Sequence, residues 1–181
     1  MPSEISGTFS DLENVLLDDA AILARVAEMA GEIERDFAGR TFTVIVIMDG
    51  ALFFVADLLR GIQAPLEMVS MNASSYHGGT KTTGEVRLPW PPGLEVRGRH
   101  VLVVDDILDT GLTLGVIQDC LALEGAASVR TAVLLKKKRS RERNAVADYV
   151  GFEIEDEFVV GYGMDYKGLF RNLPCIGTLK L

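Results

Sequence analysis

Hydrophobic side chains recur at two different spacings along the first third of the chain. Over residues 18–37 they step by three or four positions, which places them on one face of an α-helix. The positions on that face are Ile22, Val26, Met29, Ile33 and Phe37. Residues 43–48 instead form a nearly unbroken apolar run rich in β-branched side chains, as in a strand buried on both faces of a parallel sheet. The pattern predicts a helix followed by a buried strand.

The same alternation continues through the centre of the chain. Residues 51–61 and 114–124 have helical spacing, and three short segments, at 66–71, 101–104 and 129–135, are further strand candidates. Helices that alternate with strands in this way are typical of an α/β fold. We therefore expect a doubly wound, mostly parallel sheet that is flanked by helices.

Two segments lie outside this alternation. Ser10 and Glu13 have the spacing of a capping box, which predicts that a helix or helical turn begins there. Residues 72–86 are polar and rich in glycine. A loop of this length inside a compact domain is usually functional or disordered.

Composition narrows the class of protein. The 181 residues fit one domain, and the hydrophobic fraction of 48% is that of a globular chain. No apolar run approaches the length of a membrane span, and residues 1–4 lack the features of a secretory signal. Cys120 and Cys175 form neither a disulfide framework nor a metal-ligand pattern. We expect a cytoplasmic protein with no membrane partner.

Charge argues against nucleic acid as a partner. The net charge of −8 disfavours nonspecific binding to a polyanion. One segment opposes this average, because residues 136–143 hold six of the 18 lysines and arginines. A run of this kind is more often a solvated face than a nucleic-acid patch.

The most informative segment is residues 101–113. Its apolar run leads directly into Asp105 and Asp106, and Asp109 follows before the turn formed by residues 110–113. A glycine turn before a helix offers unpaired N–H groups, which favour an anion such as phosphate. An ordinary strand-to-helix connection with a threonine cap explains the turn alone about equally well.

The acidic residues decide between these readings. Two like charges ~4 Å apart repel by about 4 kcal/mol at an effective dielectric near 20, so Asp105 and Asp106 need compensation beside an anion. Sugar hydroxyls or a divalent cation would supply it, whereas a solvated strand end is the simpler alternative. Because strand side chains alternate, both carboxylates converge only if the strand ends there. The combination fits a ribose 5-phosphate, with Asp109 facing the reactive carbon or an incoming nucleophile.

Residues 101–113 resemble the phosphoribosyl-pyrophosphate signature of type I phosphoribosyltransferases, in the wording of the hypoxanthine–guanine branch. Three further segments resemble that branch in the same order along residues 15–181. They are the first substrate loop at 50–57, a flexible catalytic loop at 75–76 and 83–85, and a purine-binding hood at 150–166 and 170–174.

The resemblance implies roles for the phosphoribosyl half of the site. Asp105 and Asp106 would hold the ribose hydroxyls and are also possible Mg²⁺ ligands. Asp109 would accept the proton from the purine N7. The 5′-phosphate would be held by the turn residues Thr110, Gly111, Leu112 and Thr113.

The resemblance also implies a purine half. Lys137 would donate to the 6-oxo group, Phe158 would stack on the ring, and Val159 would read the ring edge through its backbone. Asp165 would belong to this purine pocket and bind Mg²⁺, and Arg171 would contact pyrophosphate. Glu157 departs from the branch, which often has lysine there.

Two loops complete the implied site. The Gly50 N–H would donate to pyrophosphate, and Asp49 stands where the family often has a basic residue. In the family the bond between these two positions tends to be a cis peptide. Ser75 and Tyr76 would close over the reacting centre as a lid that excludes water.

The resemblance implies purine salvage. The enzyme would move the 5-phosphoribosyl group of phosphoribosyl pyrophosphate to N9 of a 6-oxopurine and give IMP or GMP, with Mg²⁺ as cofactor. We expect one domain over residues 1–181, with a core at 40–145 and a hood from 1–20 and 146–181, in a homodimer or homotetramer. The alternatives are a non-catalytic regulator that senses phosphoribosyl pyrophosphate and, less favoured, a receiver-type phosphoacceptor module.

Overall fold

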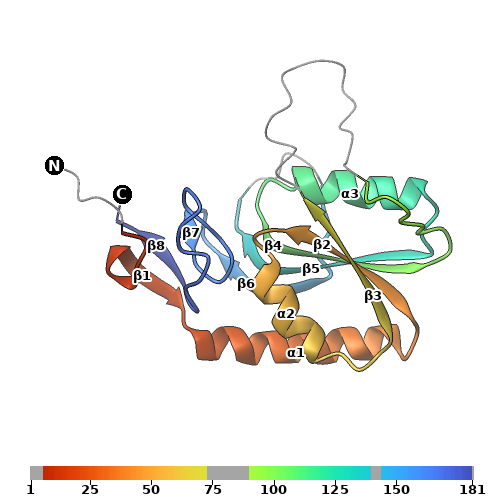
Figure 1. The fold of residues 1–181 in the computed structure, drawn as a ribbon, viewed down its shortest axis with the longest axis horizontal. Coiled ribbons are helices and arrows are strands. Elements are labelled where there is room, and N and C mark those ends of the chain that lie inside the picture. The colour runs from red at the N-terminus through yellow and green to blue at the C-terminus, as the bar shows by residue number, and fades with distance from the viewer. Residues whose placement is uncertain (1–5, 73–89, 140–143, 181) are drawn as a thin grey trace, which may run out of the picture.

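A parallel sheet forms the centre of the molecule (Figure 1). The computed structural model describes residues 6–72, 90–139 and 144–180. The sheet order is β3-β2-β4-β5-β6, and all four ladders between neighbouring strands are parallel. Its strands are β2 (Phe42–Met48), β3 (Leu66–Asn72), β4 (His100–Leu108), β5 (Ser128–Lys137) and β6 (Tyr149–Ile154).

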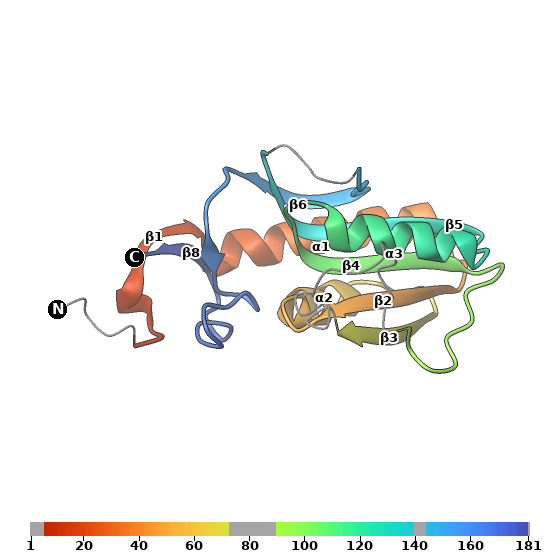
Figure 2. The same cartoon turned by 90° about the horizontal axis from the view of Figure 1, so that it is seen from above.

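Helices cover both faces of this sheet, as Figures 1 and 2 show. Helices α1 (Asp19–Phe37) and α2 (Leu52–Arg60) pack on one face, and α3 (Leu112–Leu123) packs on the other. Alternate strand residues divide between the two cores: Val44 and Leu102 belong to the core under α1 and α2, whereas Ile45 and Val103 belong to the core under α3. The predicted doubly wound α/β fold is confirmed.

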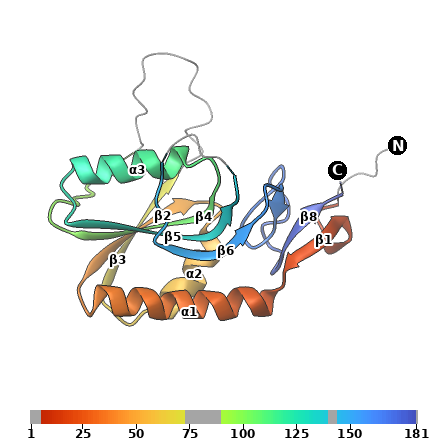
Figure 3. The same ribbon diagram turned by 180° about the vertical axis from the view of Figure 1, so that it is seen from behind.

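A second, smaller sheet lies beside the parallel one, and we call it the hood sheet (Figure 3). It has the order β1-β8-β7 and consists of β1 (Leu12–Leu17), β7 (Val159–Val160) and β8 (Ile176–Leu179). All its ladders are antiparallel, and the pair Leu12 and Leu179 joins the two ends of the chain. It has its own buried cluster, which contains Val160 and Phe170.

The prediction of a helical start at Ser10 and Glu13 is wrong in position. A 3-10 turn, η1 (Phe9–Asp11), ends there, and strand β1 begins at Leu12. The carboxylate that caps this turn belongs to Asp11, which accepts from the backbone N–H groups of residues 6–8 at 2.8–3.1 Å. Leu12 is buried in the hood sheet, so its pairing with β8 overrides the local helical signal.

The strands and helices predicted between residues 18 and 135 all exist, with small differences at their ends. The largest difference is in β4, which continues through the acidic pair to Leu108. The expectation that this strand ends at Asp105 and Asp106 is therefore wrong, because Asp105 and Ile107 still pair with Val133 and Leu135 of β5. Within the described ranges, no helix is long and apolar enough to cross a membrane.

Candidate active site

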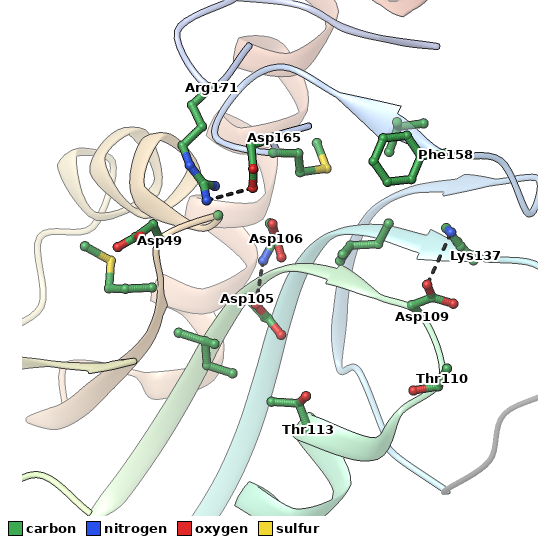
Figure 4. A pocket seen from close by; sticks show the side chains of 16 residues that line it. Asp49, Asp105, Asp106, Asp109, Thr110, Thr113, Lys137, Phe158, Asp165 and Arg171 are labelled. Atoms are coloured by element: carbon green, nitrogen blue, oxygen red, sulfur yellow. Dashed lines mark hydrogen bonds and ion pairs between the residues drawn. The ribbon is translucent and has the colours of Figure 1, made fainter. Parts of the chain in front are cut away.

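A cavity of about 630 Å³ lies where the carboxyl ends of β2, β4 and β5 meet the hood sheet. Ligands bind at this edge of open α/β sheets. Side chains from the predicted motifs line it together (Figure 4). The predicted residues among them are Gly50, Asp105, Asp106, Asp109, Thr110, Thr113, Lys137, Phe158, Val159, Asp165 and Arg171. Gly111 and Leu112 belong to the same turn, and Ser75 and Tyr76 lie outside the described residues.

The acidic pair lies at the base of this cavity. Asp105 is only 7% exposed, so a solvated strand end does not describe it. Its Oδ1 accepts the backbone N–H of Asp106 at 3.0 Å. Burial raises the pKa of Asp105 well above its ordinary value, and the neighbouring charge of Asp106 raises it further. Burial also raises the pKa of Asp106. Two desolvated carboxyl groups side by side favour a ligand that donates hydroxyl hydrogens or carries positive charge.

Gly50 packs directly against this pair. A Cβ atom on Gly50 would lie 1.8 Å from Asp106 Oδ2, which leaves no room for a side chain. A Cβ on Gly163, whose φ is +104°, would lie 2.0 Å from the Gly50 carbonyl oxygen. The loop after β2 thus packs its backbone at Gly50 against the Asp106 side chain. The backbone of the loop after β7, at Gly163, packs in turn against the backbone at Gly50.

The cis peptide bond lies one position earlier than expected. It joins Met48 to Asp49, so the expectation of a cis bond between Asp49 and Gly50 is wrong. Asp49 is exposed and lines the cavity. Its carboxylate cannot donate a hydrogen bond to an anion.

The turn after β4 leads directly into helix α3. Gly111 adopts φ +80° as the N-cap residue, a conformation that glycine reaches without strain. The Leu112 N–H donates a long hydrogen bond to Thr110 Oγ1 at 3.4 Å. Because Gly111 has no side chain to cap the helix, the next N–H groups of the first turn, those of Thr113 and Leu114, are available to a ligand. Thr110 and Thr113 line the cavity beside them. This geometry favours an anion site over an ordinary connection with a threonine cap.

Lys137 and Asp109 contact each other on one side of the cavity (Figure 4). Lys137 Nζ lies 3.2 Å from Asp109 Oδ2 and 3.4 Å from Asp156 Oδ1. Arg139 NH1 lies 3.0 Å from Asp109 Oδ1 and 3.3 Å from Asp156 Oδ1. Two carboxylates and two cations thus alternate in a closed ring, which we call the four-charge ring.

Sequence reasoning missed Arg139 and Asp156. The available signal was spacing, because Arg139 follows Lys137 by two positions and so extends from the same side of the chain beyond β5. The two lysines on either side of Lys137 have other partners. Lys136 pairs with Glu153, and Lys138 pairs with Glu155. The described part of the basic run is therefore neutralised by acidic residues, as the solvated-face interpretation requires.

The hood supplies the aromatic wall of the cavity. The Phe158 side chain is 49% exposed, and its ring meets Tyr166 edge to face with centroids 5.8 Å apart. Val159 is buried in β7. An apolar ring that remains half-exposed at a cavity can stack on a planar ligand. Glu157 is exposed and lies outside the lining.

Arg171 and Asp165 form an ion pair on the opposite side of the cavity from Lys137 (Figure 4). Arg171 NH2 lies 2.7 Å from Asp165 Oδ1, and the Gly168 N–H donates to Asp165 Oδ2 at 2.7 Å. The Arg171 guanidinium also donates to the Gly163 carbonyl. These contacts leave a fixed cation beside the Gly50 loop.

One further contact joins the hood to the core and was also missed. The Tyr162 hydroxyl donates to Asp57 Oδ2 at 2.6 Å. Burial raises the pKa of Tyr162, and the bond to Asp57 raises it further, so the hydroxyl remains protonated at neutral pH. The contact connects α2, which follows the Gly50 loop, to the loop that carries Gly163.

The residues do not form a complete metal cage. Among the residues that the structure describes, no group of three or more histidine, cysteine, aspartate or glutamate side chains is placed to hold a metal ion. Carboxylate oxygens suit Mg²⁺, which usually keeps several waters and takes further ligands from substrate phosphates. The carboxylates of Asp105, Asp106 and Asp165, which line this cavity, fit such a shared site.

The comparisons with known proteins agree with this geometry. Residues 14–167 match the model of the phosphoribosyl transferase domain. Hypoxanthine-guanine phosphoribosyltransferase of Staphylococcus epidermidis is 44% identical over 170 residues, which cover 94% of this chain and 95% of the relative. The Staphylococcus aureus protein of the same name is 41% identical over 171 residues, with 94% and 96% covered.

Solved structures show the same likeness. A crystal structure of a hypoxanthine phosphoribosyltransferase from Staphylococcus aureus has a TM-score of 0.86 at 41% identity and covers 94% of this chain and 93% of that one. A hypoxanthine-guanine phosphoribosyltransferase from Bacillus anthracis has a TM-score of 0.84 at 38% identity, with 93% and 99% covered. Fold, cavity and sequence thus agree, and the chain belongs to the phosphoribosyltransferase family, in its hypoxanthine–guanine branch.

Proposed function

We propose that the chain transfers the 5-phosphoribosyl group of phosphoribosyl pyrophosphate to N9 of hypoxanthine or guanine, giving IMP or GMP and pyrophosphate. The observation that carries this proposal is the acidic pair, buried Asp105 and half-buried Asp106, beside the N-terminus of α3. Carboxylates that accept hydrogen bonds from hydroxyl groups, next to N–H groups that donate to a phosphate, fit a ribose 5-phosphate.

In the phosphoribosyl half, Asp105 and Asp106 accept hydrogen bonds from the 2′- and 3′-hydroxyls. The turn from Thr110 to Thr113, with Gly111 and Leu112 inside it, holds the 5′-phosphate through backbone N–H groups and threonine hydroxyls. These contacts lie away from the reacting bond. They position the sugar and supply binding energy that lowers the barrier at C1′.

In the purine half, Phe158 stacks on the ring, the Val159 backbone reads its edge, and Lys137 donates to the 6-oxo group. Asp109 accepts the proton from N7 while N9 attacks C1′. Because Lys137 and Asp109 contact each other in the free protein, we infer that the purine separates them when it binds.

A third region of the site holds the leaving group. There the Gly50 N–H and the Arg171 guanidinium contact pyrophosphate. Asp165 is the carboxylate we propose for Mg²⁺, with Asp105 and Asp106 as further candidates. When bound, Mg²⁺ would neutralise charge on the departing pyrophosphate. We propose that Ser75 and Tyr76 close the cavity to water as a lid.

We also propose the following organisation. One domain spans residues 1–181. Its core extends beyond the expected 40–145, because α1 (Asp19–Phe37) packs on the parallel sheet and β6 (Tyr149–Ile154) pairs with β5 within it. The expected hood of 1–20 and 146–181 therefore begins too early at its second segment, and the hood sheet is formed by β1, β7 and β8. The protein acts in the cytoplasm as a homodimer or homotetramer. Cys120 and Cys175 form no disulfide in the described part of the chain, which suits a reducing compartment.

Replacing Gly50 with alanine is expected to raise the KM for phosphoribosyl pyrophosphate by about tenfold or more, because small displacements of positioning groups have large kinetic effects. The new methyl group occupies the position of Asp106 Oδ2 and must displace that carboxylate. Gly31→Ala on α1 is the control, since Gly31 has no positive φ and a Cβ there meets only the Arg35 guanidinium, at an ordinary contact distance of 3.5 Å. Steady-state kinetics with both variants checks this. An unchanged KM in Gly50→Ala would contradict the packing described here.

The function is tested by pyrophosphate release. The protein is mixed with phosphoribosyl pyrophosphate, Mg²⁺ and hypoxanthine, guanine or xanthine in separate reactions. We expect release with hypoxanthine, guanine or both, and loss of release when EDTA removes the metal. If the protein binds phosphoribosyl pyrophosphate but releases no pyrophosphate with any of the three bases, the proposal is contradicted and a sensing regulator is favoured.

A further inference from the structure

Arg139 lies next to the cavity without lining it. Its side chain is 34% exposed, and NH1 reaches two carboxylates, Asp109 and Asp156. A single exposed ion pair contributes little to stability and holds a side chain only weakly. Here, however, two carboxylates hold the same guanidinium nitrogen, so Arg139 is fixed from two sides.

The two oxygens of Asp109 have different partners. Oδ1 lies 3.0 Å from Arg139 NH1, and Oδ2 lies 3.2 Å from Lys137 Nζ. Lys137 lines the cavity, whereas Arg139 stands outside the lining. A ligand that enters the cavity therefore reaches Oδ2 and Lys137 first, and the Oδ1 contact with Arg139 can persist.

Asp156 stabilises both cations of the four-charge ring. It lies 3.4 Å from Lys137 Nζ and 3.3 Å from Arg139 NH1. When Lys137 leaves Asp109, Asp156 remains as its carboxylate partner, and the lysine stays near its present place. Arg139 then becomes the remaining cationic partner of Asp109 within the ring.

We propose that Arg139 is a positioning residue that anchors Asp109 Oδ1 and thereby directs Oδ2 at the purine. This inference rests on the function proposed above. In the reaction the N9 lone pair forms the bond to C1′, and the C1′–O bond breaks with its electron pair leaving on pyrophosphate. The N7 proton passes to Oδ2. Oδ1 keeps its contact with Arg139 during this transfer.

The first test compares Arg139→Gln with Lys138→Gln. Lys138 is the matched control, because its exposed ammonium pairs with Glu155 and has no contact with Asp109 in the described structure. We expect Arg139→Gln to lower kcat about tenfold and to change the KM for phosphoribosyl pyrophosphate by less than about twofold, as for loss of orientation alone. Lys138→Gln should keep the wild-type kcat, and Arg139→Lys should recover most of the loss. An equal loss in Arg139→Gln and Lys138→Gln would overturn the proposal.

The second test asks whether Arg139 acts through Asp109. In an Asp109→Asn background, we expect Arg139→Gln to have no further effect on kcat, because residues that act as one unit are not additive. A further tenfold loss in the double variant would overturn the positioning role. Full turnover in Asp109→Asn alone would instead show that the proposed base is wrong. Loss in Asp109→Asn with full turnover in Arg139→Gln would remove only the inference about Arg139.

Discussion

Replacing Asp109 with asparagine is expected to lower kcat by about 10²- to 10⁴-fold, the usual contribution of a positioned general base. Asparagine keeps the size of the side chain and still offers one oxygen to Arg139 or Lys137. It cannot accept the N7 proton as a carboxylate does. Because Asp109 is not proposed to hold the sugar or the phosphate, the affinity for phosphoribosyl pyrophosphate should change by less than about threefold, within the range of a surface contact.

This prediction is checked with two measurements on the same variant. Steady-state kinetics gives kcat, and calorimetric titration gives the Kd for phosphoribosyl pyrophosphate with Mg²⁺. A large loss of affinity with little change in kcat would contradict proton transfer by Asp109 and indicate a role in substrate binding. The Asp148→Asn variant is a suitable control, since Asp148 pairs with Arg130 on β5 and does not line the cavity.

Replacing Asp105 with asparagine is expected to stabilise the protein and to abolish most of its affinity for phosphoribosyl pyrophosphate. The stability gain follows from removing a buried, desolvated carboxylate that stands beside Asp106. The asparagine oxygen can still accept the Asp106 N–H. A gain of about 1 kcal/mol corresponds to a rise in Tm of about 2–4 °C for a chain of this size. The loss of affinity follows because the negative charge that accepts the ribose hydroxyl is gone.

The stability gain should depend on pH with a definite sign. The pKa of Asp105 is raised in the folded protein, so the folded state holds this proton more tightly than the unfolded chain does. The carboxyl group therefore does not reduce stability below its unfolded pKa of 3.8, and stability is lost as pH rises from there through the folded pKa. Asp105→Asn should match the wild type in acid and exceed it at neutral pH.

Thermal melts across this pH range, together with titration of phosphoribosyl pyrophosphate, check the prediction. Asp148→Asn again provides the contrast, because the Asp148 carboxylate accepts the Thr131 N–H at 2.8 Å and pairs with Arg130. That variant should lose stability at neutral pH. If Asp105→Asn were also less stable than the wild type at neutral pH, the Asp105 carboxylate would not destabilise the folded protein as described.

The central sheet could be predicted because its signals are local. Strands β2 and β4 contain short apolar runs, and α1 shows its period within residues 18–37. The hood sheet carries no such signal. Its strands are short, and Leu12 pairs with Leu179 from the other end of the chain, so their pairing depends on tertiary packing. The local helical signal at Ser10 was misleading for the same reason.

The site likewise contains residues that the sequence could predict and residues that only the folded chain brings together. Residues 101–113 are contiguous, so the acidic pair, Asp109 and the phosphate turn could be recognised together. Lys137, Phe158 and Arg171 came only from resemblance. The four-charge ring joins residues 109, 137, 139 and 156 from three separate segments, and its pairings exist only in the folded chain. The end of β4 was mispredicted because parallel pairing with β5 continues past two charged residues.

The most direct test of the proposed function is identification of the product. Hypoxanthine and phosphoribosyl pyrophosphate are incubated with Mg²⁺ and either the wild-type protein or Asp109→Asn, and nucleotide and pyrophosphate are quantified by chromatography with mass detection. We predict that the wild type forms IMP, ribosylated at N9, in equal amounts with pyrophosphate, and that the variant forms both at least about 10²-fold more slowly. Pyrophosphate without nucleotide, or equal rates for both proteins, would contradict the account.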